Sequence, residues 1–313
     1  MKLGIELPQE WRKDQQQPVE AYEAMARIAQ EAERQGFHSI WLFDHLQLPT
    51  PPPLEEQMMF ECWMSTAALA RDTTRIRIGQ LVTNNSFRHP ALVAKMASTI
   101  DVLSHGRFTL GMGAGWHEPE YRAYGYPFPD TATRLRQLKE SLHIIRAMWS
   151  EEEAYFEGKY VRVHGAMNQP KGVQKPSIPL LIGGKGEQIT LRLVARYGDA
   201  CNFTHPTLDE LSHKFRLIKR YCGEVGRNAQ DICHTIYLNC IVGKTETEAM
   251  TKFAGNSYTF PLDHIRARGL FGSPEMLRQR LIELEHYGVQ EVIISRRSID
   301  SPDTLALLAQ CMG

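Results

Sequence analysis

The chain of 313 residues is 42% hydrophobic, so it can bury a large core, and its length suits either two average domains or one barrel-shaped domain. Lysine and arginine together number 36, as do aspartate and glutamate, so no excess positive charge favours a nucleic acid or an anionic membrane as partner. No run approaches the roughly 18 apolar residues of a membrane span. These features favour a protein that acts on a small molecule.

The amino terminus and the cysteines indicate a cytoplasmic protein. Glu6 and Pro8 interrupt the first apolar residues, which are too few for the apolar region of a signal peptide. The cysteines form no C-x-x-C pair and have no regular spacing, so we expect reduced thiols and neither a zinc site nor a disulfide framework. They are Cys62, Cys201, Cys222, Cys233, Cys240 and Cys311.

Short β-rich runs alternate with amphipathic helical patterns along most of the chain. In the first unit, a run at 2–7 precedes a helical pattern that begins with Pro18 and stops at Gly36. The predicted strands are 2–7, 39–43, 75–82, 107–112, 179–184, 199–203, one within 232–242, and 289–295. The predicted helices are 18–35, about 55–70, about 90–103, 131–149, one ending near 197, 207–222, one from about 245, an extra one at 274–288, and one from 302.

Eight strands alternating with helices predict an α/β fold in which a parallel sheet closes into a TIM (β/α)8 barrel, as a single domain over residues 1–313. No G-x-G-x-x-G follows the first strand, which argues against an open dinucleotide-binding sheet. Two segments depart from the alternation. Residues 150–178 combine a hairpin pattern with a proline-punctuated linker, and residues 250–273 form either a lid over the site or an ordinary surface connection.

In a barrel the functional groups lie where the strands end and the loops begin. Asp44 and His45 follow the second strand, and an imidazole there can move a proton near neutral pH; the alternative is a hydrogen-bonded loop pair or helix cap. Thr83 and Asn84 follow the third strand, where amides and hydroxyls suit the polar edge of a flavin-like ring. The alternative there is ordinary turn chemistry before the next helix.

Glycines mark the ends of the fourth and fifth strands. Gly111, Gly113 and Gly115 leave one face of the fourth strand end open to a flat ring, with Trp116 as a wall beside it, unless they serve only as a barrel bend. His117 and Glu118 follow without the partner spacing of a metal site, so we expect no metal.

The run LLIGGKGEQ at the fifth strand leads directly into a helix. Backbone N–H groups at a helix start, with the cation of Lys185, predict a site for a cofactor phosphate; the alternative is a tight strand-to-helix turn. The spacing is not that of a P-loop, so ATP is not indicated.

Four segments in order, IWLFDH, FRHP, DVLSHGRFTLGMGAGWHEPEYRAYGYPFP and LLIGGKGEQITLRLVARYGDACNF, resemble the bacterial-luciferase-like family of flavin and deazaflavin oxidoreductases. The resemblance covers nearly the whole chain and is nearest to the branch of F420-dependent oxidoreductases. It implies a luciferase-like TIM barrel that binds the deazaflavin coenzyme F420, or FMN as the alternative, at the strand carboxyl ends, and it implies a homodimer.

The resemblance also assigns residues. The family's third-strand bulge, often with a non-proline cis peptide behind the ring, falls near Leu81, Val82 and Thr83, and Asn84 would contact the ring edge. Asp44 would help to hold the cofactor and His45 would be catalytic. The phosphate-binding turn falls on Gly183, Gly184, Lys185, Gly186 and Glu187.

The chain departs from the family's sugar-phosphate dehydrogenases at one position. Those enzymes carry an acidic residue directly after the third glycine of the fourth-strand run, where this chain has Trp116. The hypotheses are therefore an F420-dependent hydride-transferring oxidoreductase with an unknown small organic substrate, an FMN-dependent luciferase-like monooxygenase, and a non-catalytic flavin-binding barrel.

Overall fold

The computed structural model describes residues 1–12, 17–48, 57–255, 260–299 and 302–312. Eight parallel strands form a closed barrel, because the sheet runs from β10 to β7 and these two strands also pair with each other; the short β6 pairs with β7 beyond the eight. In order around the barrel the strands are β10 (Leu180–Gly183), β11 (Ala200–Thr204), β12 (Cys233–Leu238), β15 (Glu291–Ile294), β1 (Lys2–Glu6), β3 (Ser39–Leu42), β5 (Arg77–Gln80) and β7 (Phe108–Gly113). The predicted TIM barrel is confirmed.

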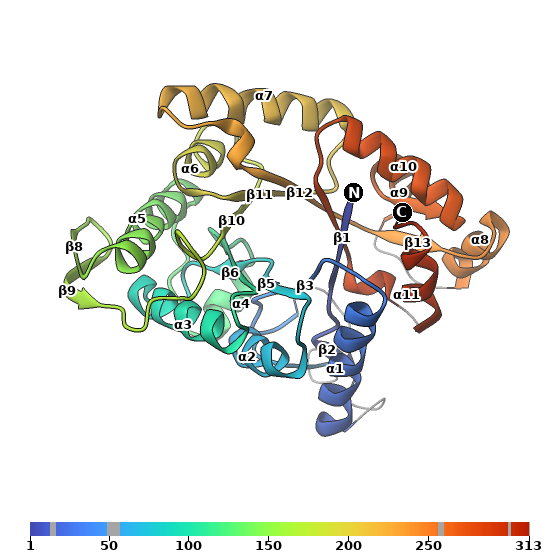
Figure 1. Ribbon diagram of the computed structural model, residues 1–313, viewed down its shortest axis with the longest axis horizontal. Coiled ribbons are helices and arrows are strands. Elements are labelled where there is room, and N and C mark those ends of the chain that lie inside the picture. Colours follow the sequence, from blue (N-terminus) through green and yellow to red (C-terminus); the bar gives the residue numbers. More distant parts are fainter. Residues whose placement is uncertain (13–16, 49–56, 256–259, 300–301, 313) are drawn as a thin grey trace.

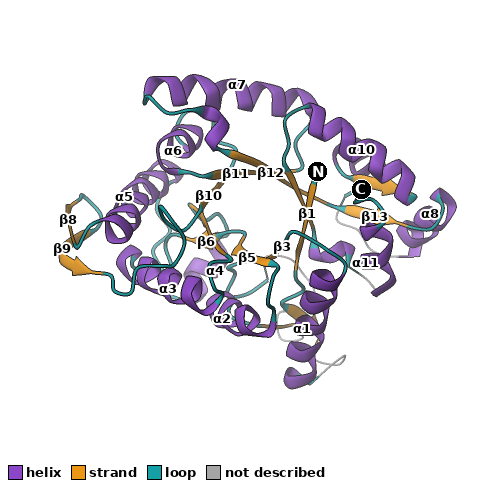
Figure 2. Cartoon of the chain, viewed as in Figure 1, coloured by secondary structure: helices purple, strands orange, loops and turns teal. Residues whose placement is uncertain are grey.

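Helices surround the strands on the outside (Figures 1 and 2). Proline at the first turn starts several of them, where its missing N–H costs nothing, and a Thr207–Glu210 capping box starts α7. The helices between or after the barrel strands are α1 (Pro18–Arg34), α2 (Cys62–Asp72), α3 (Pro90–Leu103), α5 (Thr131–Ser150), α6 (Thr190–Tyr197), α7 (Leu208–Glu224), α10 (Pro274–His286) and α11 (Pro302–Ala309). None of the described helices is both long and apolar enough to cross a membrane.

The apolar core has two parts. The larger part lies between the barrel and its ring of helices and includes Trp63, Phe108 and Phe203. A smaller cluster of buried residues, Trp41, Leu181, Ala200 and Ile293, lies apart from it, with Leu81, Val82, Cys233 and Tyr237 packed against it. The packed strands thus give the loops at their carboxyl ends a rigid base.

The predicted helix at about 55–70 is wrong at its start. Residues Gln57–Met59 form a short strand, β4, that pairs antiparallel with β2 (Glu10–Arg12), and the helix α2 begins only at Cys62. Residues 55 and 56 lie outside the described residues. The spacing of apolar residues predicted a helix here. Gln57–Met59 forms a strand instead, because its backbone hydrogen bonds come from a partner far away in the sequence.

Two predicted strands are shorter in the structure. The run at 75–82 forms only β5, which ends at Gln80, and the two-residue strand β6 (Thr83–Asn84) follows the run. The peptide bond between Leu81 and Val82 is cis, as the family resemblance implied. The run at 232–242 forms β12 and then β13 (Cys240–Val242), which pairs with β14 (Leu270–Gly272) outside the barrel.

The two predicted excursions have structure of their own. The hairpin within 150–178 is confirmed as β8 (Glu153–Glu157) and β9 (Arg162–Met167). Residues 250–273 contain the end of α8 (Glu246–Gly255), the helix α9 (Leu262–Arg268) and β14, while 256–259 lie outside the described residues. Whether this second segment acts as a lid stays a prediction.

Candidate active site

A cavity of about 340 Å³ opens where β3, β6, β7, β10 and β11 end. This volume lies in the range of small-molecule sites, and the carboxyl ends of the strands are where barrel enzymes place them. Ten of the thirteen residues predicted from the sequence line it, namely Asp44, His45, Val82, Thr83, Asn84, Gly113, Gly115, Trp116, Gly183 and Gly184.

Glycines on two strands make room for Val82. A Cβ atom added at Gly113 would lie 2.6 Å from Val82 Cγ2, and one added at Gly183 would lie 3.0 Å from Val82 Cγ1. At Gly111 the added atom would lie 1.9 Å from the backbone oxygen of Gln80. The glycines of the fourth strand thus admit the bulge at Leu81–Val82. Gly113 and Gly115 also line the cavity, and whether a flat ring lies against them stays a prediction.

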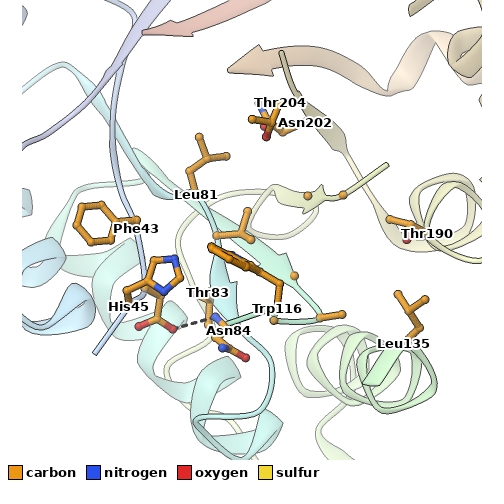
Figure 3. A pocket seen from close by; sticks show the side chains of 17 residues that line it. Phe43, His45, Leu81, Thr83, Asn84, Trp116, Leu135, Thr190, Asn202 and Thr204 are labelled. Atoms are coloured by element: carbon orange, nitrogen blue, oxygen red, sulfur yellow. Dashed lines mark hydrogen bonds between the residues drawn. The ribbon is translucent and has the colours of Figure 1, made fainter. Parts of the chain in front are cut away.

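Asp44 and Arg88 fix the loops that follow the second and third strands. The buried carboxylate of Asp44 accepts two hydrogen bonds from the guanidinium of Arg88, at 2.7 and 3.1 Å. It accepts a third from the backbone nitrogen of Asn84 at 2.9 Å, drawn as a dashed line in Figure 3. Burial raises the pKa of Asp44 above its ordinary value, and Arg88 opposes that rise. Glu61, at the start of α2, binds the same guanidinium. Asp44 therefore shapes the cavity from behind as well as lining it.

Asn84 lines the cavity, and neighbouring groups engage its amide oxygen. Asn84 Oδ1 accepts hydrogen bonds from the Tyr121 hydroxyl at 2.7 Å and from the Ser86 backbone at 3.0 Å. Gly115 lies against this pair, and a Cβ atom there would come within 1.8 Å of the Tyr121 oxygen. Thr83 is fully buried and donates to Gln80 Oε1 at 3.0 Å. A ligand at the cavity edge would meet a hydrogen-bond donor at Asn84.

His45 is held by a carboxylate that sequence reasoning missed. Glu120, on the short helix α4 (Glu118–Ala123), is fully buried, and its Oε2 lies 3.0 Å from His45 Nδ1. Its other oxygen accepts the backbone N–H groups of Leu46 and Gln47. Because a carboxylate accepts, Nδ1 carries the hydrogen and His45 Nε2 keeps a lone pair that can take a proton.

Trp116 stands at the mouth of the cavity beside His45. Trp116 is 63% exposed. Its ring packs edge to face against the imidazole of His45, with 5.8 Å between the ring centroids. Figure 3 shows His45, Phe43 and Trp116 gathered on one side of the cavity, with Leu135 and Thr190 across from them. Trp116 thus lines the cavity, and its role as a wall beside a cofactor ring stays a prediction.

The predicted phosphate turn is only partly on the cavity. Gly183, Gly184 and the first residue of α6, Thr190, line it, and Gly184 has a φ of 129°, which favours glycine. Lys185, Gly186 and Glu187 lie outside the lining. Glu187 turns toward α7, where it pairs with Lys214 at 3.3 Å and His213 at 3.2 Å. A role for these last three residues in binding a phosphate stays a prediction.

Other lining residues were not predicted. Asn202 and Thr204 are polar residues at the end of β11. The criterion that identified Asn84, a polar side chain at a strand end, could have predicted both from the sequence. Leu135 on α5 and the buried Glu120 carry no such signal, because only the folded chain brings their helices to the rim. The remaining unpredicted residues are Phe43, Ala114 and Thr190, while Leu81 belongs to the bulge that the resemblance implied.

Comparison with known proteins gives one family and several relatives. The family described as "Luciferase-like monooxygenase" matches residues 1–261. An uncharacterised protein of Mycobacterium tuberculosis is 30% identical over 216 residues, which are 65% of this chain and 75% of that protein. An F420-dependent glucose-6-phosphate dehydrogenase of Kineococcus radiotolerans is 32% identical over 178 residues, 56% of this chain but only 50% of that enzyme.

Solved structures show the same fold. An F420-dependent secondary alcohol dehydrogenase, solved with an F420–acetone adduct, superposes with a TM-score of 0.84 at 19% sequence identity. The superposition covers 99% of this chain and 98% of the dehydrogenase chain. The oxygenating constituent of a diketocamphane monooxygenase from Pseudomonas putida, solved with FMN, gives a TM-score of 0.75 at 18% identity, with 99% and 96% covered.

Proposed function

Because this chain belongs to the luciferase-like monooxygenase family, we propose that it is an oxidoreductase that uses F420 to move a hydride to or from a small organic substrate. The observation that carries the proposal is the pairing of His45 with the buried Glu120 at the edge of the cavity. Hydride transfer to or from an oxygen-bearing carbon requires a group that takes or returns the oxygen's proton.

The cavity fits a flat ring with polar edges. Val82, held between Gly113 and Gly183, gives the ring an apolar floor, and the backbone at these glycines lets a ligand approach closely. Asn84 would donate to the ring edge, and the Gly183–Gly184 turn with Thr190 would hold the phosphate end near the start of α6. When bound, F420 supplies a ring carbon that exchanges hydride with a substrate and reacts poorly with oxygen.

His45 performs the proton step in this proposal. Glu120 fixes the imidazole so that Nε2 accepts the substrate hydroxyl proton as the hydride leaves, and the same carboxylate stabilises the imidazolium that forms. Asp44 plays no part in this transfer, since Arg88 and the Asn84 backbone occupy its oxygens. Asp44 instead holds the loop after β3 against the loop after β6.

The second candidate is an FMN-dependent monooxygenase that activates oxygen. The description of the family and the FMN-bound neighbour from Pseudomonas putida favour it. The F420-dependent relative from Kineococcus radiotolerans, similar over about half of this chain, favours the deazaflavin. The arrangement of His45 and Glu120 suits the deazaflavin reaction directly, because that reaction consumes or releases a proton at the substrate oxygen.

Binding measurements separate the two candidates. The protein, freed of cofactor, is titrated with oxidised F420 and, in parallel, with FMN, and the quenching of each chromophore's fluorescence is followed. We expect F420 to bind at least about tenfold more tightly, a difference of about 1.4 kcal/mol. Tighter binding of FMN, undisturbed by added F420, would contradict the assignment of the deazaflavin.

A further inference from the structure

The residues that line the cavity offer a substrate no free positive charge. No lysine or arginine is among its lining residues in the described part of the chain, and its one carboxylate, Asp44, is bound by Arg88. The other polar lining groups are neutral amides and hydroxyls together with His45. A substrate phosphate or carboxylate placed here would find no cation to bind.

Two arginines that contact lining residues are already occupied by carboxylates. Arg88 lies between Asp44 and Glu61. Arg296 packs its guanidinium over the ring of Phe43, 4.2 Å from the centroid, and is held between two carboxylates.

The carboxylates around Arg296 are Glu6 and Glu10. Arg296 Nη1 lies 3.0 Å from Glu6 Oε2, Nε binds Glu10, and the Tyr237 hydroxyl lies 2.6 Å from the same oxygen of Glu6. Turning Arg296 toward a substrate anion would leave the buried carboxylate of Glu6 and the half-buried one of Glu10 without their cation, which is unfavourable. The cavity therefore disfavours the binding of an anionic substrate group near Phe43 and Asp44.

Apolar and aromatic side chains make up the part of the lining that surrounds His45. Phe43, Leu81 and Trp116 surround His45 in Figure 3. Trp116 is by far the largest apolar side chain left exposed at the rim, with its indole beside the imidazole. An exposed aromatic ring next to a catalytic group is suited to pack against the apolar part of a ligand.

We infer that the substrate is a neutral, largely apolar alcohol, or in the reverse direction the corresponding ketone or aldehyde, whose apolar group lies against Trp116. The inference rests on the proposed function. In the oxidative direction, bound oxidised F420 would supply the acceptor for the hydride on the carbinol carbon, and His45 Nε2 would take the hydroxyl proton. A carbonyl compound remains, so atoms and electrons balance without a further reactant.

The test compares cyclohexanol with glucose 6-phosphate as reductants of F420. We expect the wild-type kcat/KM to be at least a hundredfold higher for cyclohexanol. Trp116→Ala should raise the KM for cyclohexanol about tenfold and leave F420 affinity within about twofold, while Trp116→Phe retains most activity. Tyr155→Ala, which removes an equally exposed aromatic ring (62%) from the distant hairpin, should change nothing.

The outcomes separate this inference from the proposed function. If F420 binds and glucose 6-phosphate reduces it as efficiently as cyclohexanol does, the substrate class is wrong and the function stands. If Trp116→Ala weakens F420 binding and leaves the KM unchanged, Trp116 is a cofactor wall and its assignment here is overturned. Failure to bind F420 would instead count against the proposed function.

A second measurement does not depend on turnover. Without any coenzyme, cyclohexanone should quench the tryptophan fluorescence of the wild type saturably, and this saturable part should disappear in Trp116→Phe. Quenching that is only linear with concentration, or that is unchanged in Trp116→Phe, would overturn the inference whatever coenzyme the protein uses.

Discussion

The imidazole of His45 can act toward the cavity with one nitrogen only, because Glu120 engages the other. Glu120 is buried completely and also accepts two backbone N–H groups from the residues that follow His45. The loop and the ring are thus fixed by the same carboxylate. A histidine oriented in this way needs no rearrangement before it takes a proton, which is the usual advantage of a third group behind a catalytic base.

Replacement of His45 by asparagine tests its catalytic role. His45→Asn keeps a polar side chain of similar position but removes the proton acceptor, so we expect single-turnover reduction of F420 to slow by at least about a hundredfold. Cofactor affinity should stay nearly the same, because other groups hold the ring and the phosphate. An unchanged single-turnover rate at saturating cofactor would mean that His45 only braces its loop.

Replacement of Glu120 by glutamine tests the orienting role. An amide cannot accept from both His45 and the backbone N–H groups with the same two atoms, so the imidazole should lose its fixed orientation. We expect Glu120→Gln to lower kcat by roughly tenfold to a hundredfold, less than the loss of the imidazole itself. Glu118→Gln, on the same short helix but exposed and paired with Arg122, is the matched control and should leave kcat unchanged. Equal effects of the two substitutions would contradict this account.

At the scale of elements, the end of β7 is shaped by what must fit beside it. Gly111 and Gly113 admit the bulge of the neighbouring strand, and Gly115 admits the pair of Tyr121 and Asn84. These requirements come from close contacts with other strands and helices. The sequence pattern of alternate glycines indicated that something approaches the strand end closely, but only the fold identifies the neighbour.

Two glycines with the same backbone conformation allow a controlled test of that packing. Gly115 and Gly125 both have φ of 74°, so an alanine costs about 1 kcal/mol of backbone strain at either position. A Cβ atom at Gly115 would clash with Tyr121 and Asn84, whereas nothing lies within 4 Å at Gly125. We expect Gly115→Ala to lower the free energy of unfolding by about 1–3 kcal/mol more than Gly125→Ala and to weaken F420 binding as well. Urea denaturation and cofactor titration check this, and indistinguishable variants would refute the packing argument.

Glu33 connects α1 to the start of β5 through the backbone. Its carboxylate accepts hydrogen bonds from the N–H groups of Thr74, Arg75 and Ile76, at 2.9, 2.6 and 2.9 Å. Burial would raise the pKa of Glu33, but these hydrogen bonds outweigh it and lower the pKa to about 2. The folded-state pKa is below that of the unfolded chain, so this stabilisation is present above about pH 4.5 and is lost as the pH falls toward 2.

Glu33→Gln should therefore reduce the free energy of unfolding at pH 7 by about 1–3 kcal/mol and reduce its dependence on pH below about 4.5. Urea denaturation at a series of pH values measures both effects. Glu23→Gln on the same helix, whose exposed carboxylate lies 3.8 Å from Arg27, is the control and should have little effect. If the wild type and Glu33→Gln lost stability in parallel on acidification, the assigned role of Glu33 would be wrong.

At the scale of the whole molecule, the barrel brings together at one rim residues that are far apart in the chain. His45, Asn84, Trp116, Gly184 and Thr204 each follow or end a different strand, yet all line one cavity. The sequence predicted this gathering because parallel strands in a barrel all point the same way. It could name the polar and glycine residues at the strand ends for the same reason.

The parts that could not be predicted depend on contacts between distant segments. Strand β4 exists through pairing with β2, almost fifty residues earlier, and its own residues carry no strand pattern. Glu120 and Leu135 reach the site from helices whose rotation is set by packing. Lys185 follows the fifth strand but is not among the lining residues, so its role at a phosphate stays a prediction.

The central claim, that this barrel exchanges hydride between F420 and a substrate with His45 as the proton acceptor, is tested most directly under anaerobic conditions. The protein is mixed with oxidised F420 and cyclohexanol without oxygen, and the visible absorbance of the oxidised deazaflavin is followed. The account predicts that this absorbance disappears in proportion to the cyclohexanone formed, and that it does so far more slowly with His45→Asn. The account would be contradicted if F420 stayed oxidised under these conditions and the protein formed product only with FMN and oxygen.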